Sequence, residues 1–247
     1  MSSVVQVPFL LSHYGFSDQG VVRKNNEDFW GVSSHGNTYA LADGIGGRNA
    51  GEVAAEMSID LTLRSLEMSQ LAGGNVIDAD EALAIMREAF TYANENVVAL
   101  SQRDIACKGM GTTLCCMHFC DDGMTAYAHV GDSRIYRLRD KKIKQLTEDH
   151  VPQRPLHGKR RSHVITKAIG VSSFVDPSVA VTTTHLDDIY VLCSDGLTDG
   201  LYDEDIADII MNNDDSERAA LHLIEEAKNG GSGDNITVVI IKAENVL

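Results

Sequence analysis

The strand-like and helix-like segments of this sequence occur in separate blocks rather than in alternation. Short apolar runs broken by polar turns occupy residues 14–42, and two long segments with apolar residues at helical spacing follow, separated by Gly73-Gly74. A block of strand candidates comes next, and two shorter helices near residues 203–211 and 216–229 precede an apolar final strand. This order favours antiparallel sheets covered by helix pairs, and it argues against a doubly wound βαβ fold.

The middle block is expected to begin as an antiparallel meander. Apolar or alternating runs separated by polar turns give four consecutive strand candidates, at residues 112–119, 124–130, 134–138 and 142–146. A polar, basic loop from His150 to His163 follows. The remaining strand candidates lie at residues 179–184, 189–193 and 236–241.

Length and composition predict one globular, enzyme-sized domain over residues 1–247. The 21 Lys and Arg against 36 Asp and Glu give a net charge of −15, which would repel nucleic acid and anionic membrane surfaces. Residues 4–11 are apolar, but they lack a basic leader and a cleavage signal and are far shorter than a membrane span. No coiled-coil repeat is present, so the sequence predicts no particular oligomeric state.

The five cysteines, at positions 107, 115, 116, 120 and 193, have no paired zinc-type spacing. Their odd number does not make a closed disulfide set. A cytoplasmic location therefore fits best, with most of the thiols acting as small core residues.

Four aspartates lie where an apolar strand candidate meets a polar or glycine turn: Asp43, Asp132, Asp195 and Asp234. Strand ends can hold short carboxylates on a rigid frame that faces one cleft. Mg²⁺ and Mn²⁺ take oxygen ligands and need only a few carboxylates plus several waters. The four positions would suit such a metal pair.

Asp-Gly is also a common hairpin turn that needs no function. Asp122-Gly123 joins two adjacent strand candidates and is assigned to such a turn. The other aspartates stand out because they belong to an ordered set of eight motifs: GFSDQGVVRKNNED (15–28), ADGIGGRNAGE (42–52), GMGTTL (109–114), VGDSR (130–134), LTEDH (146–150), TKAIG (166–170), LCSDGLTD (192–199) and GDNITV (233–238).

The ordered set resembles the type 2C, or PPM, family of metal-dependent protein phosphatases in its compact bacterial form, over essentially the whole chain. The resemblance implies a four-layer α-β-β-α sandwich of two antiparallel sheets flanked by helix pairs. It also implies two Mn²⁺ or Mg²⁺ ions, and a third, weaker ion in bacterial relatives. Matching positions make Asp43 the bridging ligand, give a carbonyl ligand from Gly44, and complete the site with Asp195 and Asp234.

The same resemblance places Glu27 and Asp28 beside the metals, where they would hold metal-bound water, and assigns Asp132 to the third ion. Arg23 stands where the family has its phosphate-binding arginine, whose geometry suits two phosphate oxygens. The implied reaction is hydrolysis of phosphoserine and phosphothreonine by attack of a metal-bridging water. The implied partners are phosphorylated proteins and an opposing bacterial Ser/Thr kinase.

Two other functions stay open from the sequence: a catalytically weak module that binds phosphoproteins, and a phosphoesterase for small molecules on the same metal centre. The first would be expected to have lost a metal aspartate, whereas every matching acid is present. Cysteine nucleophile chemistry is disfavoured because Cys193 lacks a Cys-x₅-Arg phosphate loop.

The chain departs from the family pattern at two places. Ile45 replaces a histidine that can act as general acid in some eukaryotic members, and His150 or His163 is a weaker substitute. A short flap loop at about residues 150–165 replaces a longer, helix-containing flap and carries Lys159-Arg160-Arg161. Either this basic run is a solvated loop, or it contacts an acidic or multiply phosphorylated protein substrate.

Overall fold

The computed structural model describes residues 9–45, 50–73, 77–152 and 164–245. Two five-stranded sheets form its centre, and every strand pair in them is antiparallel. The first sheet has the order β1 (Phe9–Asp18), β10 (Ile236–Asn245), β9 (Ile189–Cys193), β6 (Arg134–Arg139) and β7 (Lys142–Gln145). The second has the order β2 (Asp28–Val32), β3 (Thr38–Asp43), β4 (Leu114–Phe119), β5 (Met124–Val130) and β8 (Ser178–Thr183).

The two sheets pack face to face. A buried apolar cluster draws members from both of them, including Tyr39, Leu41 and Met117 from one sheet and Tyr190 and Leu192 from the other. Alternation along each strand sends the neighbouring side chains to the outer faces, where they meet the helices. Each sheet is therefore buried on both faces, which accounts for the largely apolar β3, β4, β9 and β10.

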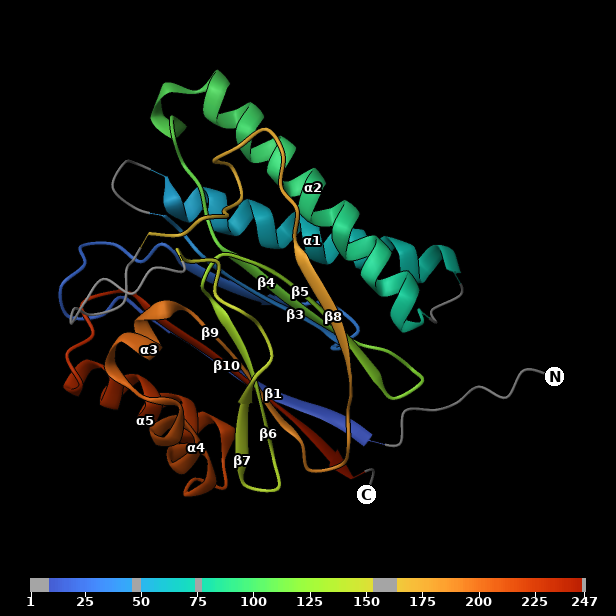
Figure 1. Ribbon diagram of the computed structural model, residues 1–247, viewed down its shortest axis with the longest axis vertical. Helices are drawn as coiled ribbons and strands as arrows, with labels where there is room; N and C mark the ends of the chain where they lie inside the picture. Colours follow the sequence, from blue (N-terminus) through green and yellow to red (C-terminus); the bar gives the residue numbers. More distant parts are fainter. Residues whose placement is uncertain (1–8, 46–49, 74–76, 153–163, 246–247) are drawn as a thin grey trace.

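Helices cover the outer face of each sheet (Figure 1). The second sheet is covered by α1 (Gly51–Gly73) and α2 (Ala79–Arg103), with the short 3₁₀ helix η1 (Ile105–Cys107) following α2. The first sheet is covered by α3 (Asp195–Gly200), α4 (Asp203–Met211) and α5 (Ser216–Asn229). The predicted four-layer α-β-β-α sandwich is confirmed.

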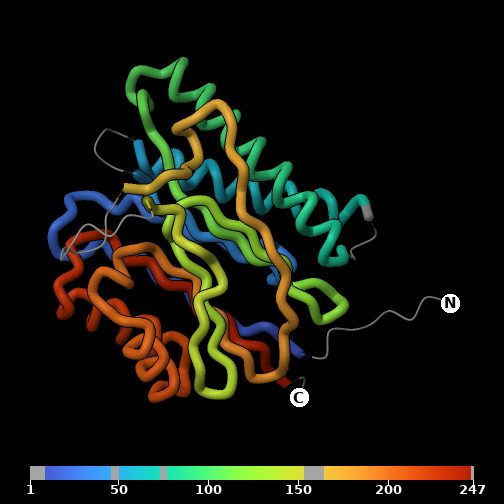
Figure 2. Tube along the Cα trace, in the orientation of Figure 1, coloured from blue at the N-terminus to red at the C-terminus, as the bar shows by residue number. Residues whose placement is uncertain are grey.

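The expected meander of four strands is wrong. The chain leaves the second sheet at the end of β5 and enters the first sheet at the start of β6, as the path of the chain in Figure 2 shows. Gly131 makes this crossing possible because its backbone has a φ of +105°, which is costly for other residues. Alternating patterns identify strands but do not say which sheet a strand joins. Asp132 consequently lies between the two sheets.

Most other predicted elements agree with the structure to within a few residues, and the Asp122-Gly123 turn is confirmed. The sequence reading missed α3, which has six residues, and η1, which has three. All five cysteines are buried and without disulfides, as predicted for core residues. The basic run Lys159-Arg160-Arg161 and His163 lie outside the described residues.

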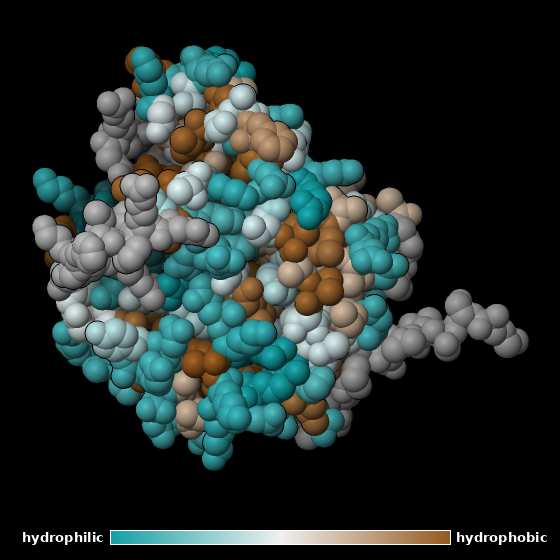
Figure 3. All heavy atoms as spheres, viewed as in Figure 1, coloured by the Kyte–Doolittle hydropathy of each residue, from teal (hydrophilic) through white to brown (hydrophobic). Residues whose placement is uncertain are grey.

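The surface seen in Figure 3 is mainly hydrophilic, and its apolar side chains form separate small patches. Over the described ranges, no helix is both long enough and apolar enough to cross a membrane.

Candidate metal centre

Asp28 and Asp43 are directly opposite each other in the β2–β3 pair. Residues paired in this way point to the same face of the sheet, with Cβ atoms about 4.5–5.5 Å apart. Burial raises the pKa of Asp28 to about 6. Burial also raises the pKa of Asp43 well above its ordinary value, and the charge of Asp28 adds to this effect. Two buried like charges in this position require a proton or a cation between them.

The first sheet contributes two more carboxylates at the same end of the molecule. Asp195 follows β9 and begins α3, and Asp234 lies just before β10, the strand that pairs with β9. Burial raises the pKa of Asp195 to about 7, and the charge of Asp132 is the next largest cause. The charges of Asp195 and Asp234 also raise the pKa of Asp43. The two sheets thus bring their strand ends together around one acidic site.

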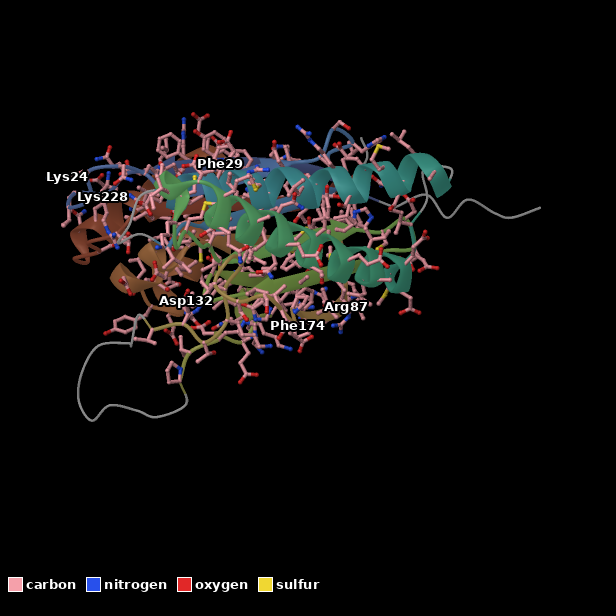
Figure 4. The ribbon with its side chains drawn as sticks, turned by 90° about the horizontal axis from the view of Figure 1, so that it is seen from above. Lys24, Phe29, Arg87, Asp132, Phe174 and Lys228 are labelled. Atoms are coloured by element: carbon pink, nitrogen blue, oxygen red, sulfur yellow. The ribbon has the colours of Figure 1, made fainter. Side chains whose placement is uncertain are left out.

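Asp132 joins this site through the chain crossing between β5 and β6. The backbone N–H of Asp43 donates to Thr113 Oγ1 at 2.9 Å, and that hydroxyl lies 2.6 Å from Ser133 Oγ. Two of the sequence motifs, GMGTTL and VGDSR, therefore meet beside Asp43. Figure 4 shows Asp132 at the same end of the molecule as Lys24 and Lys228, with Arg87 farther along.

Asp28 also ties the two sheets together. Its Oδ2 accepts hydrogen bonds from Ser194 Oγ and Thr237 Oγ1, both at 2.7 Å. Its Oδ1 is buried and has no hydrogen-bond partner among the described residues. One oxygen of this carboxylate is thus structural, and the other is available to a ligand.

Glu27 and Gly44 lie directly beside this pair. The Gly44 N–H donates to the Glu27 carbonyl at 3.1 Å, and the Glu27 N–H donates to Asn235 Oδ1 at 2.9 Å. Any side chain at position 44 would collide with Gly51 and the Glu27 carbonyl, because a Cβ there would lie 2.5 Å and 2.7 Å from their backbone atoms. Glu27 Oε2, like Asp28 Oδ1, is buried without a hydrogen bond from the described residues.

Asp43, Asp132, Asp195 and Asp234 line a cleft of about 590 Å³ together with Arg23, whereas Glu27 and Asp28 are not among its described lining residues. Arg23 Nη2 donates to Asp234 Oδ2 at 2.5 Å, and the arginine side chain is 44% exposed. The cleft is lined by Arg23, Asp43, Gly44, Ile45, Thr113, Asp132, Ile165, Asp195, Thr198, Asp199, Tyr202, Gly231, Gly233 and Asp234. The phosphate-binding arginine expected from the sequence therefore lies in the same cleft as the expected metal ligands.

The donor set fits hard divalent cations. Burial raises the pKa values of Asp28, Asp43 and Asp195, and Asp28 and Glu27 each have a buried oxygen without a hydrogen bond among the described residues. Carboxylate oxygens are the ligands that Mg²⁺ and Mn²⁺ prefer. Within residues 9–45, 50–73, 77–152 and 164–245, no three His, Cys, Asp or Glu side chains are gathered closely enough to enclose an ion as they stand.

The cleft wall also includes Thr198, Asp199 and Tyr202, to which the sequence motifs assign no role, although LCSDGLTD (192–199) contains the first two. All three lie in or just after α3, the short helix that was not predicted. Asp199 lies four residues after Asp195, so a helix beginning at Asp195 can place both carboxylates on one side. Its charge is among the causes that raise the pKa of Asp195.

His150 is not among the described residues that line the cleft. Its Nδ1 accepts from the Gly131 N–H at 3.1 Å, its Nε2 lies 2.9 Å from Ser178 Oγ, and its ring stacks on His129 at 4.6 Å. Burial lowers the pKa of His150 to about 4. Ile45, by contrast, lines the cleft, as its position beside Asp43 predicts.

Fold and site together define an α-β-β-α sandwich protein with an acidic, cation-binding cleft between the ends of its two sheets. The family model for protein phosphatase 2C matches residues 21–213. The serine/threonine protein phosphatase PstP of Mycobacterium tuberculosis is 33% identical over 96% of this chain and 46% of its own length. The serine/threonine phosphatase stp of Listeria welshimeri is 29% identical over 92% of this chain and 93% of its own.

Solved structures show the same similarity. The catalytic domain of PstP in complex with two manganese ions superposes with a TM-score of 0.79 at 31% identity, covering 95% of this chain and 99% of that one. Stp1 from Staphylococcus aureus superposes with a TM-score of 0.83 at 28% identity, covering 97% and 98%. The chain belongs to the protein phosphatase 2C family. It spans about half the length of PstP and nearly all of the Listeria protein.

Proposed function

We propose that this chain is a metal-dependent protein serine/threonine phosphatase. Carboxylates from both sheets line the same cleft as Arg23, and the proposal depends mainly on this arrangement. Hydrolysis of a phosphomonoester needs cations that neutralise developing charge and a group that positions the phosphate, and this cleft offers both. The names of the relatives support the choice of phosphorylated serine and threonine.

We assign the metal-binding role to Asp43, Asp195 and Asp234, with the carbonyl of Gly44. Two Mn²⁺ or Mg²⁺ ions bound there would supply a water activated for attack on phosphorus and would neutralise the phosphate oxygens. The manganese ions in the PstP catalytic domain support Mn²⁺ as the first ion to test. Asp132 is assigned to a third, weaker ion.

Glu27 and Asp28 are assigned to orienting water at the metal site. Each has one buried oxygen without a hydrogen bond among the described residues, and each is held by its other contacts. Fixed acceptors of this kind hold a nucleophile in one orientation without having to reorganise during the reaction.

Arg23 is assigned to binding the phosphate. Its ion pair with Asp234 keeps the guanidinium at the cleft, and a substrate phosphate can accept two N–H donors from the same fork. Cations bound at Asp234 would compete with Arg23 for that carboxylate. Loading of the metal site would therefore free the arginine for the substrate.

No dedicated general acid is assigned. Ile45 cannot transfer a proton, and His150 has a pKa of about 4 and makes its hydrogen bonds away from Asp43. A water held in the site would then protonate the leaving serine or threonine oxygen.

The proposed partners are phosphorylated proteins and a Ser/Thr kinase whose action the enzyme reverses. The net charge of −15 disfavours nucleic acid and anionic membrane as partners. We place the protein in the cytoplasm, because its five cysteines are buried, free and odd in number. We also propose that residues 1–247 form one catalytic domain, because the residues that line the cleft are spread along the chain from Arg23 to Asp234.

The test is phosphate release from matched phosphoserine, phosphothreonine and phosphotyrosine peptides and from nucleotides, with Mn²⁺ and after metal removal. We expect Mn²⁺-dependent release from the first two peptides and almost none from Asp195→Asn. Faster release from nucleotides would favour a small-molecule phosphoesterase. Peptide binding without release by the wild-type protein would favour a regulatory binding module.

A further inference from the structure

Tyr202 presents a large aromatic side chain to solvent at the mouth of the catalytic cleft. It lines the cleft, and 80% of the residue is exposed. Among the described residues, its ring contacts no other aromatic ring and its hydroxyl has no hydrogen bond. Folding therefore leaves this surface available for contact with another molecule.

The position of Tyr202 is fixed although its side chain is exposed. Its N–H donates to Asp205 Oδ2 at 3.0 Å, and its carbonyl accepts from the Ile206 N–H at 3.1 Å. The preceding residue, Leu201, donates to the Leu197 carbonyl at the end of α3. The residue thus forms the rigid joint between α3 and α4, so a contact with its ring loses little backbone entropy.

Two of the three carboxylates that follow Tyr202, Asp203 and Asp205, are already engaged, and the third, Glu204, is exposed. Asp203 accepts from the Tyr136 hydroxyl at 2.9 Å and lies 3.7 Å from Arg134, and Asp205 binds the Tyr202 backbone. Bound divalent ions would offset most of the negative charge on the cleft floor. Tyr202 supplies an apolar ring to this wall, and Ile45 and Ile165 are the other large apolar residues among the described lining.

We propose that Tyr202 determines substrate specificity by packing against an apolar side chain next to the phosphorylated serine or threonine. This inference rests on the proposed phosphatase function. A peptide anchored by its phosphate at Arg23 brings its flanking residues against the cleft wall, because Arg23 and Tyr202 line the same cleft. Tyrosine suits this role because it offers a large contact area with few rotatable bonds.

The experiment compares two phosphothreonine peptides that differ only in the flanking residues, which are leucine in one and glycine in the other. With the Mn²⁺-loaded wild-type protein, we expect kcat/KM to be roughly tenfold higher for the leucine peptide, as for burial of one ordinary side chain. Tyr202→Ala should reduce this ratio to about one, and Tyr202→Phe should retain it. A third peptide with flanking lysines tests whether the ring attracts cations instead.

Tyr92→Ala is the matched control. Tyr92 is also exposed, at 51%, but it lies in the middle of α2 and does not line the cleft. This variant should keep both the preference and the rate. Thermal denaturation shows whether Tyr202→Ala has merely damaged the fold.

Several results would overturn the inference. They are an unchanged leucine preference in Tyr202→Ala, an equal loss on both peptides with an intact fold, or a wild-type preference for the lysine peptide. If the wild-type protein releases phosphate from no peptide, the proposed function fails. The affinities of the uncleaved peptides, measured by titration calorimetry, then decide whether Tyr202 makes the contact.

Discussion

Replacing Asp28 by asparagine should stabilise the metal-free protein at high pH. Asp28 is only 6% exposed, and one of its oxygens has no hydrogen bond among the described residues. Burial raises its pKa from 3.8 to about 6. At about 1.4 kcal/mol for each pH unit, this difference means that the ionised carboxyl destabilises the folded protein by about 3 kcal/mol.

The sign of the pH dependence follows from the order of ionisation. Below pH 3.8 the carboxyl is protonated in both the folded and the unfolded chain, so it has no effect on stability. As the pH rises toward about 6, the unfolded chain ionises first, and the folded state loses stability. Asparagine removes this loss, and its amide oxygen can still accept from Ser194 and Thr237.

The assay is urea denaturation of wild-type and Asp28→Asn protein in a metal chelator, near pH 4 and near pH 8. We expect the variant to be more stable by up to about 3 kcal/mol near pH 8 and little changed near pH 4. Asp60→Asn is the control, because Asp60 is exposed on α1 and far more solvated. An equal change at both pH values, or none near pH 8, would refute the reasoning.

Three further substitutions test the cleft and its support. Arg23→Ala should lower kcat/KM on a phosphopeptide about 10- to 100-fold, as for loss of a charged hydrogen bond, while Mn²⁺ affinity does not fall. A kcat/KM equal to that of the wild-type protein would contradict the assignment of Arg23 to phosphate binding. Gly44→Ala should destabilise the protein by about 2 kcal/mol and weaken Mn²⁺ binding, because the added Cβ would collide with Gly51 and the Glu27 carbonyl. An unchanged melting temperature would show that the backbone shifts freely to make room for it. Asp149→Ala leaves the buried guanidinium of Arg134 without its bidentate partner, so it should lower the free energy of unfolding by about 3–5 kcal/mol in chemical denaturation. A loss under about 1 kcal/mol would mean that solvent reaches Arg134.

Local patterns were enough to predict most of the fold. The apolar spacing of α1, α2, α4 and α5 reflects burial of each helix against one sheet, and the apolar runs of β5 and β9 reflect burial between two layers. The sheet to which each strand belongs depends on contacts between distant segments. For this reason the sequence pattern predicts one more hairpin of a meander at Gly131, where the chain in fact crosses to the other sheet.

The sequence motifs contain most of the cleft carboxylates, but they do not give the geometry of the cleft. The motifs pointed to Asp43, Asp195 and Asp234, and the structure brings them to one cleft. The opposition of Asp28 to Asp43 depends on the register of β2 against β3, and the ion pair between Arg23 and Asp234 joins residues 211 positions apart. Neither can be derived from spacing along the sequence.

The most direct test of the metal-centre account is calorimetric titration of the metal-free protein with Mn²⁺, with phosphopeptide hydrolysis measured on the same samples. The account predicts at least two ions per wild-type chain and their loss together with activity in Asp43→Asn, because this residue is assigned as the bridge between them. Asp132→Asn should retain two ions. Full activity in wild-type protein stripped of metal, or two ions still bound by Asp43→Asn, would contradict it.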